Sequence, residues 1–216
     1  MGGRRLFTLA LFIFLAVVPS ALANQGGWHT GTGWNGDRGN LKGSATVPST
    51  GGVIASVSMQ SCTCVGAGLV QAGEIKEGSS LTTDCGTGAI GYIFEKANVN
   101  GMLSCNPMFG TFGSDHRFAN VRKAGTSGTW NEYVDGVVFI TYTLNWGQGN
   151  AYARSEYNGS APSAFSFTWG PSGETQWQNT NDSGSSYHTI GTEAVQFNDG
   201  GWLFTNSPPS PFTVFR

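Results

Sequence analysis

Short runs in which apolar and polar residues alternate recur along most of this chain. Residues 52–60 alternate through Val53, Ala55, Val57 and Met59, and similar runs occupy residues 68–75, 88–96, 116–122, 129–134, 137–144, 151–157, 165–169 and 202–204. Alternation with a period of two predicts strands with one buried face, and the Gly- and Asn-rich gaps predict turns. No segment has a sustained helical period, so the sequence predicts an all-β sandwich or jelly roll.

The clearest turn lies within residues 130–139, where Asp135 and Gly136 separate two runs of β-branched and aromatic residues. Asp-Gly accepts positive φ at both central positions of a turn, so this segment predicts a two-residue β-hairpin. The same pattern favours a turn role for Asp135 over a role as a calcium ligand.

The N-terminus carries an export pattern. Arg4 and Arg5 precede an apolar run over residues 6–18, and residues 21–23 supply the small residues of a cleavage site. The run is shorter than the ~20 residues that a membrane span needs, so we expect residues 1–23 to be a signal peptide and the mature chain to be secreted, with no membrane association after cleavage. Residues 24–216 are predicted to form a single β-sandwich domain, with a Gly/Trp-rich arm over residues 24–42 and a Pro-rich strap over residues 206–211.

Composition narrows the class of protein further. The 216 residues include 11 Lys and Arg against 13 Asp and Glu, so the chain has no basic field and we expect no nucleic-acid partner. Fourteen Phe and seven Trp favour an aromatic-rich extracellular β-domain. We expect the mature protein to be a monomer.

The chain has four cysteines: Cys62, Cys64, Cys85 and Cys105. An even number in an exported protein predicts two disulfides. The loop between Cys62 and Cys64 is tight, so we expect each of these two to pair with Cys85 or Cys105. There is no CxxC motif and no clustered histidine, and we expect no metal and no organic cofactor.

Two polar residues stand in apolar strand segments: Gln71 within residues 69–73, and Glu156 within residues 151–157. A carboxylate and an amide that met across one face of a sheet would activate a water and hold an oxyanion. Two other interpretations remain open. Gln71 would brace a strand through its hydrogen bonds, and Glu156 would be a solvated partner of Arg154, which shares its strand face with Tyr152.

At these motifs the chain resembles the glutamic peptidases of the eqolisin family. Residues 70–73 and 151–156 are similar to the family's glutamine and glutamate strands in order, spacing and context, and Glu95 resembles the acidic position of the strand between them. A longer run through residues 116–118 and 130–136 is similar to uncharacterised secreted proteins, mostly bacterial, that are related to this fold. The resemblance implies a concanavalin-like antiparallel β-sandwich. Residues 61–68 lack the Trp and Asp that the family carries before its glutamine strand.

The resemblance also implies an endopeptidase that acts at acidic pH on a polypeptide substrate. Glu156 would take a proton from water and return it to the leaving amine, while Gln71 would position the water and donate to the oxyanion. We expect Glu95, Trp130 and Tyr152 to contact the substrate.

Two alternatives do not require this chemistry. The first is a lectin-like module that binds a glycan, with Trp130, Tyr152, Trp169 and Trp177 stacked on sugar rings. The second is an inactive structural protein of the cell envelope, which the low charge of the chain would also suit.

Overall fold

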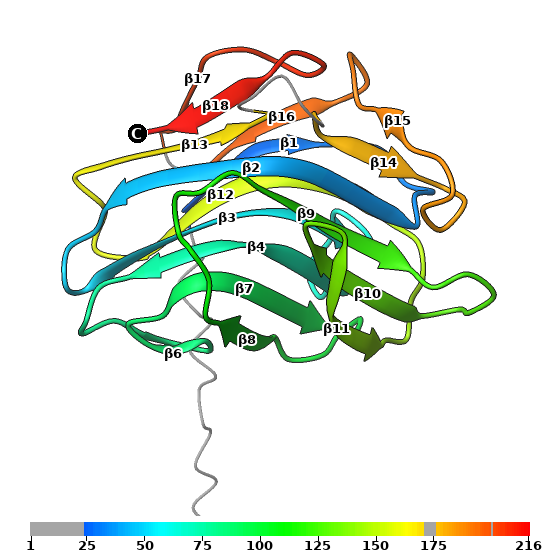
Figure 1. The fold of residues 1–216 in the computed structure, drawn as a ribbon, viewed down its shortest axis with the longest axis horizontal. Helices are drawn as coiled ribbons and strands as arrows, with labels where there is room; N and C mark the ends of the chain where they lie inside the picture. Colours follow the sequence, from blue (N-terminus) through cyan, green and yellow to red (C-terminus); the bar gives the residue numbers. More distant parts are fainter. Residues whose placement is uncertain (1–23, 171–175, 200) are drawn as a thin grey trace, which may run out of the picture.

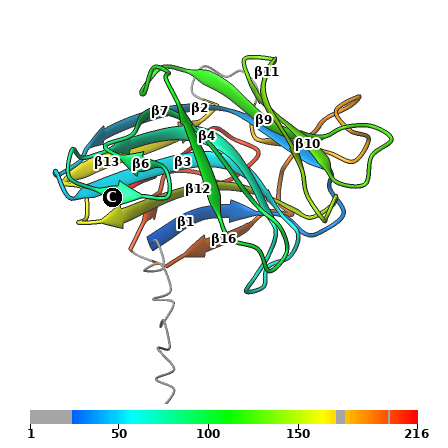
Figure 2. The same cartoon turned by 90° about the horizontal axis from the view of Figure 1, so that it is seen from below.

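The computed structural model describes residues 24–170, 176–199 and 201–216, so the predicted signal peptide lies outside the described residues. These residues form two antiparallel sheets packed face to face, with β2, β9 and β10 in one layer and β1, β12 and β16 in the other (Figures 1 and 2). The all-β sandwich predicted from the alternating pattern is therefore confirmed. In the part of the chain that is described, no helix is long and apolar enough to cross a membrane.

Sheet I has seven strands in the order β16-β1-β12-β3-β4-β7-β8. Their bounds are β1 Asn24–His29, β3 Gly51–Gln60, β4 Leu69–Glu77, β7 Ile90–Ala97, β8 Ser104–Met108, β12 Asn150–Gly159 and β16 Val195–Asn198. A separate two-stranded ribbon, β5 (Thr82–Thr83) with β6 (Gly86–Thr87), lies between β4 and β7 in sequence.

Sheet II has nine strands. Seven follow the order β11-β10-β9-β2-β13-β18-β17, while β14 pairs with β2 and with β15. Their bounds are β2 Gly36–Thr46, β9 His116–Arg122, β10 Thr129–Val134, β11 Val137–Thr143, β13 Ala164–Trp169, β14 Gln178–Thr180, β15 His188–Thr189, β17 Leu203–Phe204 and β18 Phe212–Phe215.

The inner face of sheet I follows the predicted alternation. Val53, Ala55, Val57 and Met59 of β3 are all buried in the main core, as are Ala151 and Ala153 of β12. Ile54, the apolar residue that is out of phase in β3, lies on the outer face in a second small cluster with Ile75, Ile93 and Cys85. The outer face of sheet I is therefore also covered in part.

The Asp135-Gly136 hairpin is confirmed. Asp135 has φ 51° and Gly136 has φ 83°, and β10 and β11 pair on either side of them. Positive φ at both central positions is the geometry that matches the twist of a two-residue hairpin.

Residues 24–42, which the sequence predicts as a Gly/Trp-rich arm, contain β1 and most of β2, and these strands pair within the two sheets. In β1 the glycines allow close strand pairing: a Cβ on Gly27 would lie 2.1 Å from the carbonyl oxygen of Ala153, and one on Gly26 would meet the ring of Trp202. Only Trp28 of β1 is a large apolar residue that packs on the main core, so this strand shows no alternation of apolar side chains.

A row of polar side chains crosses the core of the sandwich. Asp37, Asn120 and Glu132 lie opposite one another on β2, β9 and β10, and all three are fully buried. Asn120 donates to Asp37 Oδ1 and to the carbonyl oxygen of Val57, both at 2.9 Å. This row therefore ties sheet II to the backbone of sheet I.

Candidate functional site

The outer face of sheet I gathers the polar residues that the sequence singles out. Because side chains alternate along a strand, Arg154 and Glu156 of β12 point away from the core that holds Ala153. Gln71 of β4 lies directly opposite Glu95 of β7. Four polar side chains from three strands thus share one face.

Gln71 is fully buried and is held at three points. Its side-chain Nε2 donates to Glu95 Oε2 at 2.9 Å, and its Oε1 accepts a short hydrogen bond from Nη2 of Arg154. Its backbone N–H donates to Oε1 of Glu132, which reaches across from sheet II at 3.0 Å. These contacts fix the orientation of the amide and leave one Nε2 hydrogen free of the contacts described.

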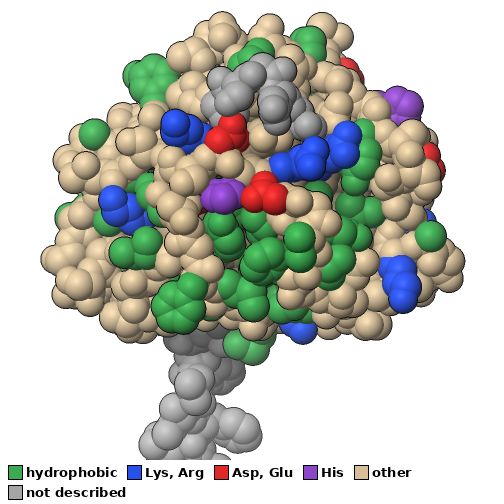
Figure 3. Space-filling model, viewed as in Figure 1, with side chains coloured by type: hydrophobic (Ala, Val, Ile, Leu, Met, Phe, Trp, Pro, Cys, Tyr) green, Lys and Arg blue, Asp and Glu red, His purple; other side chains and the backbone are tan. Residues whose placement is uncertain are grey.

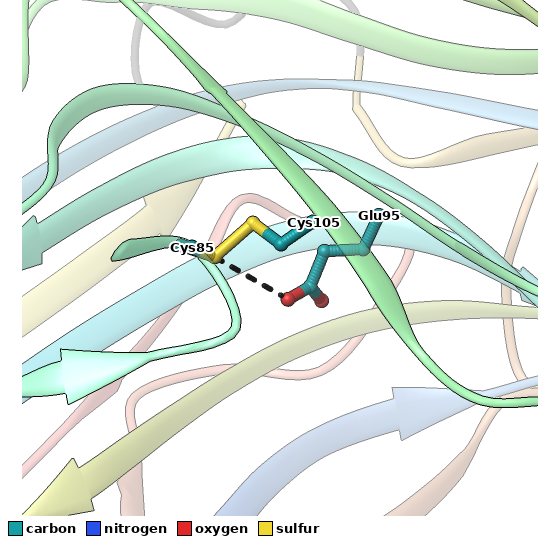
Figure 4. A group of neighbouring side chains, drawn as sticks. All are labelled: Cys85, Glu95 and Cys105. Atoms are coloured by element: carbon teal, nitrogen blue, oxygen red, sulfur yellow. Dashed lines mark hydrogen bonds between the residues drawn. A yellow bond between two sulfur atoms is a disulfide. The ribbon is translucent and has the colours of Figure 1, made fainter. Parts of the chain in front are cut away.

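Glu95 lies in an environment that favours its protonated form. Burial, and after it the negative charge of Glu156, raise its pKa to about 8, although the positive charge of Arg154 lowers it. Oε1 of Glu95 lies 3.7 Å from Sγ of Cys85, beside the Cys85–Cys105 disulfide (Figure 4). A disulfide sulfur has no hydrogen, so in this contact the protonated carboxyl donates and the sulfur accepts.

Glu156 accepts a hydrogen bond of 3.0 Å from Nε2 of Gln25 on the neighbouring strand β1. No hydrogen bond joins Glu156 to Gln71 within the described residues. The register explains this, because Gln71 aligns through Ser58 with Tyr152, and Glu156 lies four residues further along β12. Arg154 lies between the two and contacts Gln71, while Glu95 contacts Gln71 from β7 on its other side. The four residues therefore form one cluster in which Gln71 and Glu156 are not in contact.

A cavity of about 690 Å³ opens over this cluster. Glu95, Arg154 and Glu156 line it, together with apolar side chains from β3, β4 and two loops, Ile54, Leu69, Leu81 and Leu103. The β5–β6 ribbon supplies one wall through residues 82–85. Gln71 is not among the lining residues, so it acts on this cavity through Glu95 and Arg154. Apolar walls with a few convergent polar groups are typical of ligand sites.

Arg154 is the residue that sequence reasoning treated only as a possible partner of Glu156. It is buried, its Nε has no hydrogen-bond partner within the described residues, and its guanidinium joins Gln71 to the cavity. Strand alternation gave the signal, since Arg154 shares a face with Glu156. A buried arginine has to find acceptors, and here the acceptor is Gln71.

Two of the three expected substrate contacts, Trp130 and Tyr152, do not line the cavity. Trp130 is fully buried in the main core, where its Nε1 donates to the carbonyl oxygen of Trp146 at 3.1 Å, so its assignment to substrate is wrong. Alternation places it on the inner face of β10. Tyr152 is on the correct face, but it is buried and stacked on His29 with ring centroids 5.3 Å apart. Glu95 lines the cavity.

The expected disulfide pairing is also wrong. The bonds are Cys62–Cys64 and Cys85–Cys105. The loop at Cys62 brings the two Cα atoms of its pair to 5.3 Å, which is inside the usual range for a disulfide. Cys105 lies opposite Glu95 in the sheet, and the β5–β6 ribbon folds over the same face to meet it. Cys85, Glu95 and Cys105 lie close enough to share an ion, but both sulfurs are committed to the disulfide.

Comparison with known proteins supports the fold. No known family profile matches the sequence, and no curated relative matches it. Among solved structures, SCP-B, a member of the eqolisin family of peptidases in complex with the tripeptide Ala-Ile-His, superposes with a TM-score of 0.57 at 15% identity. The match covers 90% of this chain and 97% of that one. Scytalido-glutamic peptidase with a peptide-based transition state analog gives the same TM-score, identity and coverage. The chain has the concanavalin-like fold of the eqolisin peptidases.

Proposed function

We propose that this protein is a secreted, acid-acting peptidase that uses Glu156 as its general base. The observation that carries the proposal is the convergence of Glu156, Glu95 and Arg154 on one cavity above Gln71, in a fold shared with glutamic peptidases. A polypeptide in the cavity would be attacked by a water that Glu156 deprotonates. The proton then passes to the leaving amine.

The remaining residues of the cluster support that step. The guanidinium of Arg154 faces the cavity and carries the positive charge that a tetrahedral oxyanion requires. Gln71 lies behind the cavity and positions this guanidinium through its Oε1. Glu95, protonated at acidic pH, orients the amide without adding a second negative charge beside Glu156.

A glycan-binding role has less support. Trp130, Trp169 and Trp177 are buried in the main core, so these side chains offer no platform for sugar rings. Tyr152 is covered by its neighbours as well. The aromatic residues that motivated the lectin alternative therefore stabilise the sandwich.

The first experiment is cleavage of an unfolded protein substrate by the purified mature domain between pH 2 and pH 7. We expect peptide products at acidic pH, identified by mass spectrometry, and their loss above pH 6. A matched preparation of the Glu156→Gln variant excludes a contaminating protease. A folded domain that produces no peptides at any pH would refute the proposal.

Replacing Arg154 by methionine is expected to lower kcat by about 10²-fold, because one preorganised oxyanion donor is lost. Arg154→Lys keeps the charge but not the planar fork, so it should recover only part of the rate. Steady-state kinetics tests this, with Lys123→Met, at an exposed residue outside the cavity, as the control variant. A change confined to KM would contradict the assignment.

A further inference from the structure

A second cavity, of about 270 Å³, lies on the outer face of sheet II, on the opposite side of the sandwich from the candidate active site. Arg38 of β2, Ala119 of β9 and Tyr133 of β10 lie in one cross-strand row and form part of its lining. Arg117 lies two residues before Ala119 on β9 and lines the same cavity. Residues 183–187, in the loop after β14, close one side of it. On this face basic side chains lie next to acidic and histidine side chains (Figure 3).

The two guanidinium groups of this cavity have donors to spare. Arg38 Nε donates to Gln178 Oε1 at 2.8 Å, and its guanidinium carbon lies 3.6 Å from the centre of the Tyr187 ring. An arginine has five N–H donors, so the four on the Nη atoms of Arg38 have no partner among the contacts described. The guanidinium of Arg38 is therefore held in a fixed orientation, while its Nη atoms can still donate to a ligand.

The nearby acidic groups do not neutralise the positive charges of Arg38 and Arg117. Within the described residues, the salt bridge of this chain joins His116 Nδ1 to Asp135 Oδ2 at 2.8 Å, and Asp135 Oδ1 accepts the backbone N–H of Arg117. Asp37, behind Arg38 in the core, has its pKa raised to about 8 by burial and is neutral below that pH. Burial lowers the pKa of Arg38, Tyr187 raises it, and the like charge of Arg117 lowers it again. Two cations therefore face one small cavity.

We propose that this cavity binds a small hydroxylated carboxylate, of the class of a sugar acid. The two guanidinium groups would hold the carboxylate, for which the arginine fork has the matching geometry. Tyr133, Tyr187 and Ser183 line the remaining surface and supply hydroxyl groups that can pair with those of the ligand. The volume lies just below the ~300–1,000 Å³ of sites for drug-sized ligands, which suits a single sugar ring.

The test is isothermal titration calorimetry at pH 7 and low ionic strength, with sodium glucuronate as the probe. Glucose is the neutral probe of the same ring size, and N-acetylglycine is a carboxylate without hydroxyl groups. We expect a dissociation constant of about 1 mM for glucuronate, binding at least tenfold weaker for both controls, and a clear loss of affinity in high salt.

Variants locate the site. Arg117→Gln should weaken glucuronate binding at least tenfold, and Arg38→Gln should do the same, while Lys123→Gln, which removes an exposed charge outside the cavity, should leave it unchanged. Circular dichroism checks that each variant is folded, and either arginine variant alone suffices for the test. Equal binding of glucose or of N-acetylglycine would overturn the assignment to a sugar acid. Unchanged affinity in a folded Arg117→Gln variant would overturn the site.

Discussion

Replacement of Glu156 by glutamine is expected to lower kcat/KM for peptide cleavage by about 10³-fold or more at the optimal pH. A positioned general base contributes about 10²–10⁴-fold, and an amide of the same shape cannot take a proton from water. The substitution is nearly isosteric, and the amide oxygen can still accept from Nε2 of Gln25, which contacts Glu156 at 3.0 Å. Folding should therefore be preserved, so the loss reports on chemistry.

The measurement is a steady-state assay at acidic pH on wild-type, Glu156→Gln and Glu193→Gln protein. Glu193 is an exposed carboxylate on the loop after β15, so its variant carries the same charge change away from the cavity. We expect Glu193→Gln to retain full activity. If the Glu156→Gln variant keeps more than a tenth of the wild-type rate with an unchanged thermal transition, another group is the base.

The strand pattern was predictable from the sequence because most core strands alternate strictly. The bounds of β9 and β10 agree with the runs at residues 116–122 and 129–134. The arrangement of the candidate site was less accessible. Alternation places Gln71 and Glu156 on one face, but their offset of four residues depends on the register of β3 against both neighbours, which is a property of the folded sheet.

The misplaced residues have specific causes. Trp130 shares the inner face of β10 with Glu132 and Val134, so alternation alone would have removed it from the surface. The same alternation predicts that Glu132 is a buried acid. It also predicts that Glu74 is buried, because Glu74 shares the inner face of β4 with Val70 and Ala72. An aromatic residue can contact a ligand only where the alternation of its strand turns its side chain away from the core. The ribbon that brings Cys85 to Cys105 carries too few residues for any periodic signal.

These buried acids lead to the second large expected effect: the protein should be most stable at acidic pH and lose stability as the pH rises. Asp37, Glu74, Glu95 and Glu132 are all buried, and within the described residues none lies within 4 Å of a Lys or Arg nitrogen. Burial raises the pKa of Asp37, Glu74 and Glu95 to about 8 and that of Glu132 well above its usual range.

The sign follows from proton binding. Below about pH 4, these carboxyls are protonated in both the folded and the unfolded chain, so their burial carries no ionisation cost. Between pH 4 and pH 8 the unfolded chain releases the protons and the folded chain retains them. Each pKa unit of difference then removes about 1.4 kcal/mol of folding stability. We expect the free energy of unfolding to fall by at least about 3 kcal/mol from pH 4 to pH 8.

Urea denaturation at pH 4, 6 and 8 measures this slope, and Glu132→Gln tests its origin. The glutamine oxygen can still accept the N–H of Gln71, while its amide replaces an oxygen, Oε2, that has no partner within the described residues. This variant should gain about 2 kcal/mol at pH 8 and change by less than about 1 kcal/mol at pH 4. Asp199→Asn, at an exposed carboxylate, should leave the free energy of unfolding unchanged at both pH values.

A wild-type stability that rises from pH 4 to pH 8 would show that these carboxyls ionise within the fold and are stabilised there. The predicted slope has the opposite sign to that of a protein whose carboxylates are held in salt bridges, which loses stability in acid. The same burial that keeps Glu95 protonated beside Gln71 would then favour the folded state in the pH range in which Glu156 is proposed to act. Acid stability and the neutral state of Glu95 beside Gln71 would share one physical cause, the removal of carboxyl groups from water.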